Sequence, residues 1–256
     1  MRLIAWNSNF NNKGRSFEED ATCLFAEGAD LIVLSESTRP KTPQNSQCGW
    51  THWKAGKDLG LGVVAGPGYQ LTASPLNASA PAIFSGYKVQ GPVSFNLLAS
   101  WPVNEEGTPS YTRLLNSALD HFEGFLTEGP TIMAGDYNSS TKVKEQAATH
   151  PAFVARMAGL NLHSAYHHRT REQHGLETKH TFRCSHGQFH IDYCFLSPGL
   201  LNAAQVEILD VPIWESRSDH YAVQVDLPDL SYPRVAYMPE TFGRRLFARF
   251  SRPIRD

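Results

Sequence analysis

The most apolar segments of this chain begin or end at polar side chains. LIAW, LIVLS and TIMAG each lead into a polar residue, and in YCFL and YAVQV the polar residue comes first. Short, continuous apolar runs are typical of strands that are covered on both faces. Polar groups are therefore expected where buried strands emerge from a rigid sheet. They are Asn7, Glu36, Asp136, Asn138, Asp192, Asp219 and His220.

The direction of these segments predicts that the polar groups meet. Asn7, Glu36 and Asp136 follow their apolar runs, whereas Asp192 and the Asp219-His220 pair precede theirs. If the last two strands run antiparallel to the first three, all five motifs lie at one edge of the fold. That edge would carry several carboxylates, two amides and a histidine.

Periodicity predicts an α/β protein. Residues 2–6 and 30–35 fit strands that flank a helix over 16–28, which Ser16 can cap and Gly28 can end. Residues 53–100 fit short antiparallel strands broken by glycine and proline, whereas residues 37–50 are rich in turn formers. Further predicted elements are helices over 109–127 and 151–159, strands over 191–197 and 221–227, and a polar loop over 163–188.

Composition narrows the classes of protein. The 256 residues have 41% hydrophobic content and a formal net charge of -2, which favours a globular domain without the basic face of a general nucleic-acid binder. Four cysteines without C-x-x-C spacing indicate free thiols in a reducing, cytoplasmic compartment. No apolar run approaches membrane-spanning length. We expect one catalytic domain over 1–227 and a basic, arginine-rich tail over 228–256.

The polar set suits a hard divalent cation, because Mg²⁺ prefers carboxylate, water and phosphate oxygens. Glu36 is the best single ligand candidate, and Asp219 could assist it. Asp136 is then left to orient or deprotonate a water, while the amides of Asn7 and Asn138 can donate to phosphate oxygens. His220 can stabilise developing charge, and Asp192 is its natural orienting partner.

The order and spacing of these motifs resemble the endonuclease/exonuclease/phosphatase superfamily, which includes deoxyribonuclease-like enzymes. The resemblance covers roughly residues 1–226, on W-N at Asn7, S-E at Glu36, G-D-Y-N at 135–138, H-I-D-Y at 190–193 and S-D-H at 218–220. It implies a four-layer α-β-β-α sandwich with two mostly antiparallel mixed sheets. It also implies metal-dependent hydrolysis of a phosphate ester, with Glu36 and Asp219 serving the metal and Asp136 handling the water. The same resemblance assigns phosphate contact to Asn138 and a paired dyad to Asp192 and His220.

Two positions depart from the family pattern. Many members carry an acid two residues after the first Asn, where this chain has Asn9, so metal binding would depend more on Glu36. Many nucleases also carry a second catalytic His at the position of Ser100 or Trp101. Abasic-site enzymes of the superfamily use a Tyr instead, which makes Tyr111 a candidate substitute, although it could equally be an apolar contact of its helix.

Other features admit more than one interpretation. The histidines between His163 and His190 could bind zinc, but no H-E-x-x-H helix or paired cysteines support this, so a polar loop beside the active edge is the favoured interpretation. A third interpretation is a patch for substrate phosphate that includes Arg183 and His190. Trp101 could stack on a base, or it could belong to the core.

The leading hypothesis is a Mg²⁺- or Mn²⁺-dependent nuclease that acts on a nucleic-acid phosphodiester. A phosphatase or phosphodiesterase acting on a small phosphorylated molecule is the first alternative, because the near-neutral charge gives no global basic face. A non-catalytic binding module on the same fold is the second alternative, supported by Asn9 and the missing histidine. The combined presence of Glu36, Asp136 and the two dyad residues argues against that module.

Overall fold

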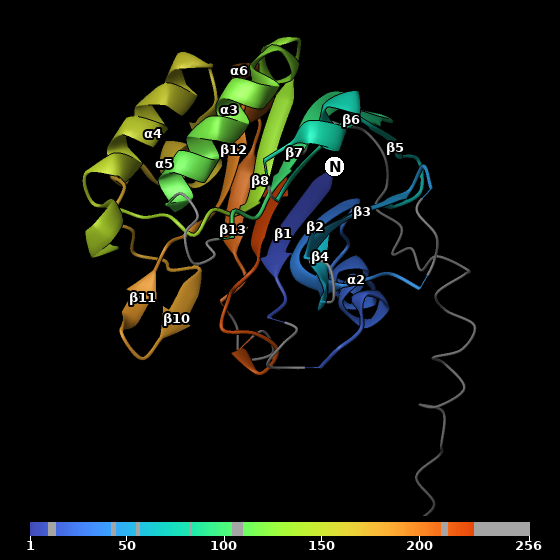
Figure 1. Cartoon of the computed structure of the whole chain (residues 1–256), viewed down its shortest axis with the longest axis horizontal. Coiled ribbons are helices and arrows are strands. Elements are labelled where there is room, and N and C mark those ends of the chain that lie inside the picture. The colour runs from blue at the N-terminus through green and yellow to red at the C-terminus, as the bar shows by residue number, and fades with distance from the viewer. Residues whose placement is uncertain are drawn as a thin grey trace, which may run out of the picture.

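The computed structural model describes residues 1–9, 14–41, 45–54, 57–81, 83–103, 110–210 and 215–227, and at positions 53–54 and 57–58 it describes the backbone only. Two six-stranded sheets pack face to face, and helices lie on their outer sides (Figure 1). The tail predicted over 228–256 lies outside the described residues, so the predicted division of the chain stays a prediction.

The first sheet has the strand order β13-β14-β1-β2-β4-β3. Its neighbours β1 and β2 are parallel, and the other four pairs are antiparallel. This sheet therefore contains the predicted β-α-β unit at its centre. Its strands are β1 (Arg2–Asn7), β2 (Leu31–Thr38), β3 (Cys48–Lys54), β4 (Lys57–Ala65), β13 (Gln205–Ile208) and β14 (Val223–Asp226).

The second sheet has the strand order β5-β6-β7-β8-β12-β9, again with one parallel pair, β7 and β8. A separate hairpin of β10 (Phe182–Cys184) and β11 (Gly187–Phe189) projects beside it (Figure 1). The strands of the second sheet are β5 (Gln70–Ala73), β6 (Phe84–Gln90), β7 (Phe95–Ser100), β8 (Thr131–Asp136), β9 (His163–Ser164) and β12 (Asp192–Leu196).

Alternation along the strands creates two cores. In β8, Ile132 and Ala134 face the first sheet, while Met133 between them packs under helices with Leu119 and Phe153. The helices are α2 (Phe17–Ala26), α3 (Tyr111–Thr127), α4 (Thr149–Gly159), α5 (Ala165–Thr170) and α6 (Pro198–Leu201), with 3₁₀ turns at Pro75–Ser79 and Lys144–Gln146. Because α3 and α4 cover the second sheet and α2 packs on the first, the predicted four-layer α-β-β-α sandwich is confirmed.

The start and end of α2 follow from local chemistry. Ser16 accepts a hydrogen bond from the backbone of Glu19, and the Glu19 carboxylate accepts one from the backbone of Ser16, which forms a capping box. Gly28 has a φ of 80°, a left-handed conformation that suits the chain reversal after the helix. The helix predicted over 16–28 is confirmed, with its regular part ending at Ala26.

Two segments contain more regular structure than predicted. Within 37–50, β2 continues to Thr38 and β3 begins at Cys48, because both strands pair with β4 across the sheet. The loop predicted over 163–188 contains β9, α5 and β10. Its polar residues gave no apolar period, and the pairing of His163 and Ser164 with β12 depends on distant residues.

All four cysteines are free thiols, as predicted. In the part of the chain that the structure describes, the helices are too short or too polar to cross a bilayer.

Gly135 is required by the parallel contact between β7 and β8. Its φ is 139°, and a Cβ atom there would lie 2.1 Å from the carbonyl oxygen of Ser100. We predict that Gly135→Ala lowers the free energy of unfolding by at least about 3 kcal/mol, since strain and backbone overlap add. Urea denaturation measures it. The matched control is Gly124→Ala in α3, where a Cβ meets nothing within 4 Å and a gain of about 0.5–1 kcal/mol is expected. Equal stability of the two variants would contradict the prediction.

Candidate active site

The polar residues of the predicted motifs lie at one edge of the sandwich, where the two sheets meet. β14 runs antiparallel to β1, and β12 runs antiparallel to β8, so Asp192 is directly opposite Asp136 in the ladder. The ends of β1 and β2 bring Asn7 and Glu36 to the same place. We call this set the polar edge; it comprises Asn7, Glu36, Asp136, Asn138, Asp192, Asp219 and His220.

One amide joins the two sheets at the polar edge. The side-chain nitrogen of Asn7, on β1, donates to a carboxylate oxygen of Asp136, on β8, at 2.9 Å. The same nitrogen donates to Glu36, on β2, at 3.2 Å. Asn7 is fully buried, so these bonds are shielded from water. Its two N–H groups are both used, and they hold two carboxylates side by side.

A bulge turns Glu36 toward this amide. The pairing of β2 with β4 changes register between Leu34 and Ser37, and Glu36 has a φ of 51°. The hydroxyl of Ser8 donates to the Glu36 carbonyl at 3.1 Å and fixes the irregular backbone. A bulge re-aims a side chain that an ordinary strand would present to the wrong face. The Glu36 carboxylate therefore faces the edge while remaining half-buried.

Asp136 and Asn138 are held by a tight turn at the end of β8. The backbone N–H of Asn138 donates to Asp136 at 2.7 Å, and Asn138 has a φ of 50°. The Asn138 amide nitrogen donates to the carbonyl of Pro102 at 3.2 Å. Only one of its two N–H groups is engaged by that bond, so the other remains for a ligand.

His220 and Asp192 form a buried pair. Nδ1 of His220 lies 3.0 Å from a carboxylate oxygen of Asp192, and both side chains are at least 94% buried. The carboxylate accepts the Nδ1 proton, which turns Nε2 outward from the pair. Ser218 accepts a hydrogen bond from the backbone N–H of His220 and donates to the carbonyl of Asn7, tying β14 to β1.

The electrostatics of the edge follow from burial and crowding of acids. Burial, together with the charge of Asp192, raises the pKa of Asp136 to about 7. Burial also raises the pKa of Glu36, and the charges of Asp219 and Asp192 add to this effect. For His220, burial lowers the pKa, but the charge and hydrogen bond of Asp192 outweigh it and raise the value to about 10. His220 is therefore a cation among acids at neutral pH.

The donor set fits a divalent cation. The negative charges of Asp136, Asp192 and Asp219 lie close enough to Glu36 or His220 to affect their pKa values. A bound cation would relieve the repulsion between these acids by neutralising part of their charge. One carboxylate oxygen of Asp192 is buried and makes no hydrogen bond to the described residues. Asp136, Asp192 and His220 offer donor atoms within 4.8 Å of one another, but the Asp192–His220 hydrogen bond already occupies two of these side chains.

The five predicted substrate-binding residues are dispersed. Asn9 is buried and donates to Asp219 at 2.6 Å, so it supports an acid of the edge. Tyr111 is half-buried at the start of α3, and its pKa is raised by burial and by the charges of Asp136 and Glu36. Arg183 donates to the hydroxyl of Tyr221 at 3.0 Å and pairs with Glu215.

Trp101 and His190 differ from the surface roles considered for them. Trp101 is 3% exposed and belongs to the hydrophobic core, so base stacking would require it to leave that core. His190 is 1% exposed, and its Nδ1–H donates to the carbonyl of Lys179 at 3.0 Å. Sequence adjacency to β12 gave no information on the face to which His190 points.

Two residues that the sequence did not single out support the dyad. The hydroxyl of Thr181 accepts hydrogen bonds from the backbone N–H groups of Ile191 and Asp192, each at 3.0 Å. The ring of Phe182 lies 4.6 Å from the ring of His220 and covers one of its faces. Thr181 precedes the hairpin and Phe182 is its first residue, in a segment without apolar period, so no sequence signal identifies them.

No protein-family profile and no curated protein sequence matches the chain. Solved structures do match. A 3′ phosphatase NExo from Neisseria, bound to product DNA hairpin, is 17% identical with a TM-score of 0.63, covering 89% of this chain and 99% of that one. An AP endonuclease from Archaeoglobus fulgidus is 12% identical with a TM-score of 0.65 and the same coverage. The Xenopus laevis APE2 catalytic domain is 14% identical with a TM-score of 0.65, covering 89% and 91%. The superfamily resemblance is confirmed at the level of the fold.

The raised pKa of Asp136 predicts a pH-dependent stability in the presence of a chelator. Its folded pKa of about 7 exceeds the ordinary 3.8, so its contribution is full below that ordinary value and is lost as the pH rises through about 7. Asp136→Asn mimics the protonated acid. Urea denaturation from about pH 4 to about pH 8 should show the variant gaining stability relative to the wild type. A pH-independent difference would contradict the burial of an ionising Asp136.

Proposed function

We propose that this protein is a divalent-metal-dependent phosphoesterase, and specifically a nuclease. The observation that carries the proposal is the joint placement of Glu36 and Asp136 by one buried amide, directly opposite the Asp192–His220 pair. A cation-binding acid, a potential base and a protonated histidine are thereby fixed around one point. Hydrolysis of a phosphate ester needs these three functions together.

The metal is proposed to be Mg²⁺ or Mn²⁺, held by Glu36 with help from Asp219. When bound, such an ion neutralises charge on phosphate oxygens and favours their attack by water. Asn9, which replaces an acid in the family pattern, donates to Asp219 and so positions a ligand without adding a negative charge. Carboxylate-rich sites of this kind accept both ions.

The remaining catalytic roles are assigned to residues of the polar edge. Asp136 orients the attacking water and accepts its proton, which requires the ionised carboxylate. His220, kept protonated by Asp192, donates to a phosphoryl oxygen as charge develops there. Asn138 donates its second N–H to the phosphate. Asn7 acts as a positioning residue, because both of its N–H groups are used by Glu36 and Asp136.

Nucleic acid is the proposed substrate. The structural neighbours include an AP endonuclease and a phosphatase bound to a DNA hairpin, which supports a phosphodiester or a terminal phosphate on DNA. Tyr111, close enough for Asp136 and Glu36 to affect its pKa, is proposed to contact the substrate where other nucleases use histidine. The free thiols at all four cysteines support a cytoplasmic location.

A phosphomonoesterase is the second candidate. The 3′ phosphatase among the neighbours and the near-neutral net charge of -2 favour it. The two candidates share the polar edge and differ in how much nucleic acid must lie beyond the scissile phosphate. A binding module without catalysis is disfavoured, because Asp136 and the buried His220–Asp192 pair keep their mutual geometry.

Nicking of supercoiled plasmid in Mg²⁺, run beside release of phosphate from a 3′-phosphorylated oligonucleotide, tests the proposal. Whichever of the two reactions the wild type catalyses, we predict that Asp136→Ala lowers its rate by at least about 100-fold, since the substitution removes the base. A chelator should abolish that reaction. Nicking by the wild type supports the nuclease, and phosphate release alone supports the phosphomonoesterase. Turnover that persists in Asp136→Ala would overturn the site assignment.

Glu36→Gln tests the metal assignment. Glutamine keeps the shape and the contact with Asn7 but removes the charge, so we predict that the Mg²⁺ concentration for half-maximal rate rises at least about tenfold. The control is Glu19→Gln, in the capping box of α2 and outside the polar edge, which should leave the metal dependence unchanged. An unaltered metal dependence in Glu36→Gln would show that Glu36 is not a ligand.

The dyad predicts an order of effects and a pH shift. His220→Ala should slow turnover by about 100-fold or more, and Asp192→Asn should slow it less, because an orienting partner contributes less than the group it orients. Asp192 raises the pKa of His220, so Asp192→Asn should move the alkaline limb of the rate profile to lower pH. The reverse order, or an unmoved limb, would contradict the pairing proposed for catalysis.

A further inference from the structure

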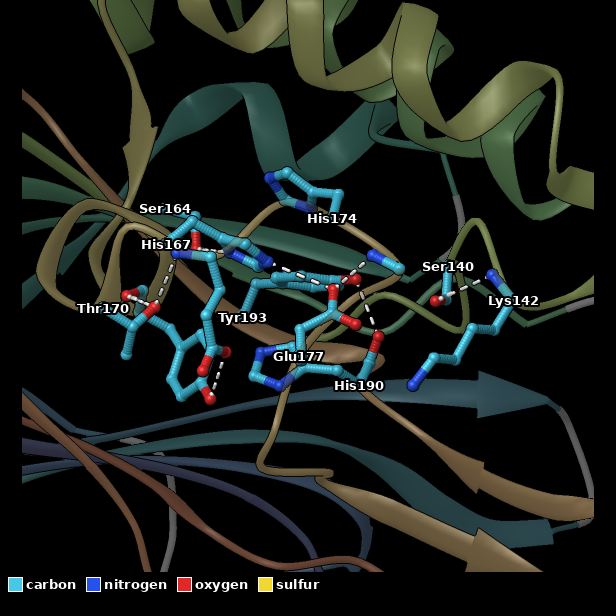
Figure 2. A network of polar contacts seen from close by, with 12 residues as sticks. Ser140, Lys142, Ser164, His167, Thr170, His174, Glu177, His190 and Tyr193 are labelled. Atoms are coloured by element: carbon cyan, nitrogen blue, oxygen red, sulfur yellow. Dashed lines mark hydrogen bonds and ion pairs between the residues drawn. The ribbon is translucent and has the colours of Figure 1, made fainter.

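A second cluster of ionisable side chains lies away from the polar edge, beneath α4 and α5 and against β12. It contains the imidazoles of His150, His167, His174 and His190 around the carboxylate of Glu177, and we call it the histidine cluster. Figure 2 shows Glu177 between the rings of His167 and His174 on one side and that of His190 on the other. The mechanism proposed above uses none of these side chains.

Three members of the histidine cluster are placed as metal ligands. One ring nitrogen of His167, one of His174 and one carboxylate oxygen of Glu177 lie within 4.8 Å of one another. Nε2 of His167 is 3.1 Å from that carboxylate, close to the separation of two ligands on one tetrahedral ion. Two nitrogens and one carboxylate form a ligand set that zinc sites use, leaving a fourth position for water or another ligand.

Neighbouring groups orient the imidazoles. Nδ1 of His167 lies 2.8 Å from the hydroxyl of Ser164, which can accept its proton and leave Nε2 with a lone pair. Nδ1 of His174 lies 3.3 Å from His150, whose other nitrogen contacts the hydroxyl of Ser139 at 2.8 Å. Such supporting bonds to the second ring nitrogen are typical of histidines that bind metal.

The cluster contains buried polar atoms without partners. One carboxylate oxygen of Glu177 and Nε2 of His190 make no hydrogen bond to any described residue, and the two side chains are 8% and 1% exposed. Unpaired buried polar atoms are unfavourable and are rare in cores that serve packing alone. Both atoms belong to side chains of the histidine cluster, which indicates that the cluster accommodates a further group.

A cavity of about 160 Å³ adjoins the cluster and gives a ligand access to it. It is lined by His163, His167, His168 and His174 together with apolar side chains of α4. The rings of His167 and His174 are stacked, with centroids 3.5 Å apart and planes 14° apart. Two parallel rings do not point at one ion, so one of them must turn on binding, and the cavity provides the space.

We propose that the histidine cluster is a zinc site, with His167, His174 and Glu177 as the protein ligands. Imidazole nitrogen selects Zn²⁺ over Mg²⁺, which requires oxygen ligands, so this site and the polar edge take different ions. Zinc binding replaces the contact between Nε2 of His167 and Glu177 with two metal–ligand bonds, and water fills the fourth position.

The zinc site has a structural role. The segment from α5 to Thr181 carries all three ligands, and Thr181 at its end accepts hydrogen bonds from the backbone of Ile191 and Asp192. The backbone N–H of Tyr221 also donates to the carbonyl of Thr181 at 2.7 Å. Zinc therefore stabilises the segment whose Thr181 bonds to the backbone of Asp192 and of Tyr221, the residue after His220. The ion does not contact the substrate.

Titration with ZnCl₂ tests the proposal. The full chain carrying Glu36→Gln and Asp136→Asn is used, so that zinc binding at the polar edge is weakened beforehand. This protein should bind one equivalent of zinc by calorimetry, with a raised melting temperature. Adding His174→Ala or Glu177→Gln should weaken zinc binding at least about 100-fold. Loss of a residue that only hydrogen-bonds to a metal ligand already lowers metal affinity about 10- to 100-fold, and these two residues are ligands themselves. Adding His186→Ala, on the exposed hairpin, should change nothing and is the matched control.

Cobalt gives a second, spectroscopic readout that reports the kind of ligand atom as well as binding. CoCl₂ bound by nitrogen in a four- or five-coordinate site absorbs strongly in the visible, whereas six oxygen ligands give only weak bands. The strong absorption should appear in the protein with the altered polar edge and disappear when Glu177→Gln is added. Absence of zinc binding, weak cobalt bands, or binding unaffected by both cluster variants would each overturn the proposal.

Discussion

The hydrogen bonds of the Asn7 amide are the contact on which the candidate active site depends. Asn7 is the last residue of β1, one of the two central strands of its sheet, and Asp136 is the last residue of β8, one of the two central strands of the other. Two sheets packed through apolar side chains can slide with little penalty, because apolar contact is not directional. A buried amide that donates to acids on both sheets fixes their relative position at the place where chemistry would occur.

The backbone around the polar edge is strained because the side chains there must be held in one position. Asn9, Glu36 and Asn138 all have positive φ values, which are uncommon outside glycine. Glu36 interrupts the pairing of β2, and Asn9 and Asn138 each lie two residues past the end of a strand. Such strain persists only when the surrounding structure over-determines it, and it is common at functional sites. The ladders of the two sheets supply that support, including the close approach of Gly135 to Ser100.

The two ionisable clusters illustrate how environment separates similar side chains. At the polar edge, Asp192 keeps His220 protonated, with a pKa of about 10. In the histidine cluster, burial dominates, and the pKa of His150 falls to about 4. A protonated imidazole can assist a phosphate, whereas a neutral one can bind a metal. One chain thus contains both kinds of histidine, separated by the strand β12.

The sequence by itself determined the strand–helix pattern and the polar residues at strand ends, while the sandwich was implied by the resemblance of its motifs to the superfamily. These features are local or periodic: Ser16 caps a helix within four residues, and apolar runs specify buried strands wherever they pair. The opposed order of the motifs also predicted that Asp192 and His220 would meet Asp136 at one edge if the last two strands run antiparallel to the first three.

Only the tertiary structure decided the remaining contacts, because they join residues that are distant in sequence. The donation of Asn7 to both acids spans the two sheets, and Thr181 supports Asp192 from a segment that has no apolar period. Trp101 belongs to the core and His190 to the second cluster, a choice of face that adjacency to a strand could not make. Contacts of this kind depend on how strands are ordered in the sheets, and a linear pattern does not encode that order.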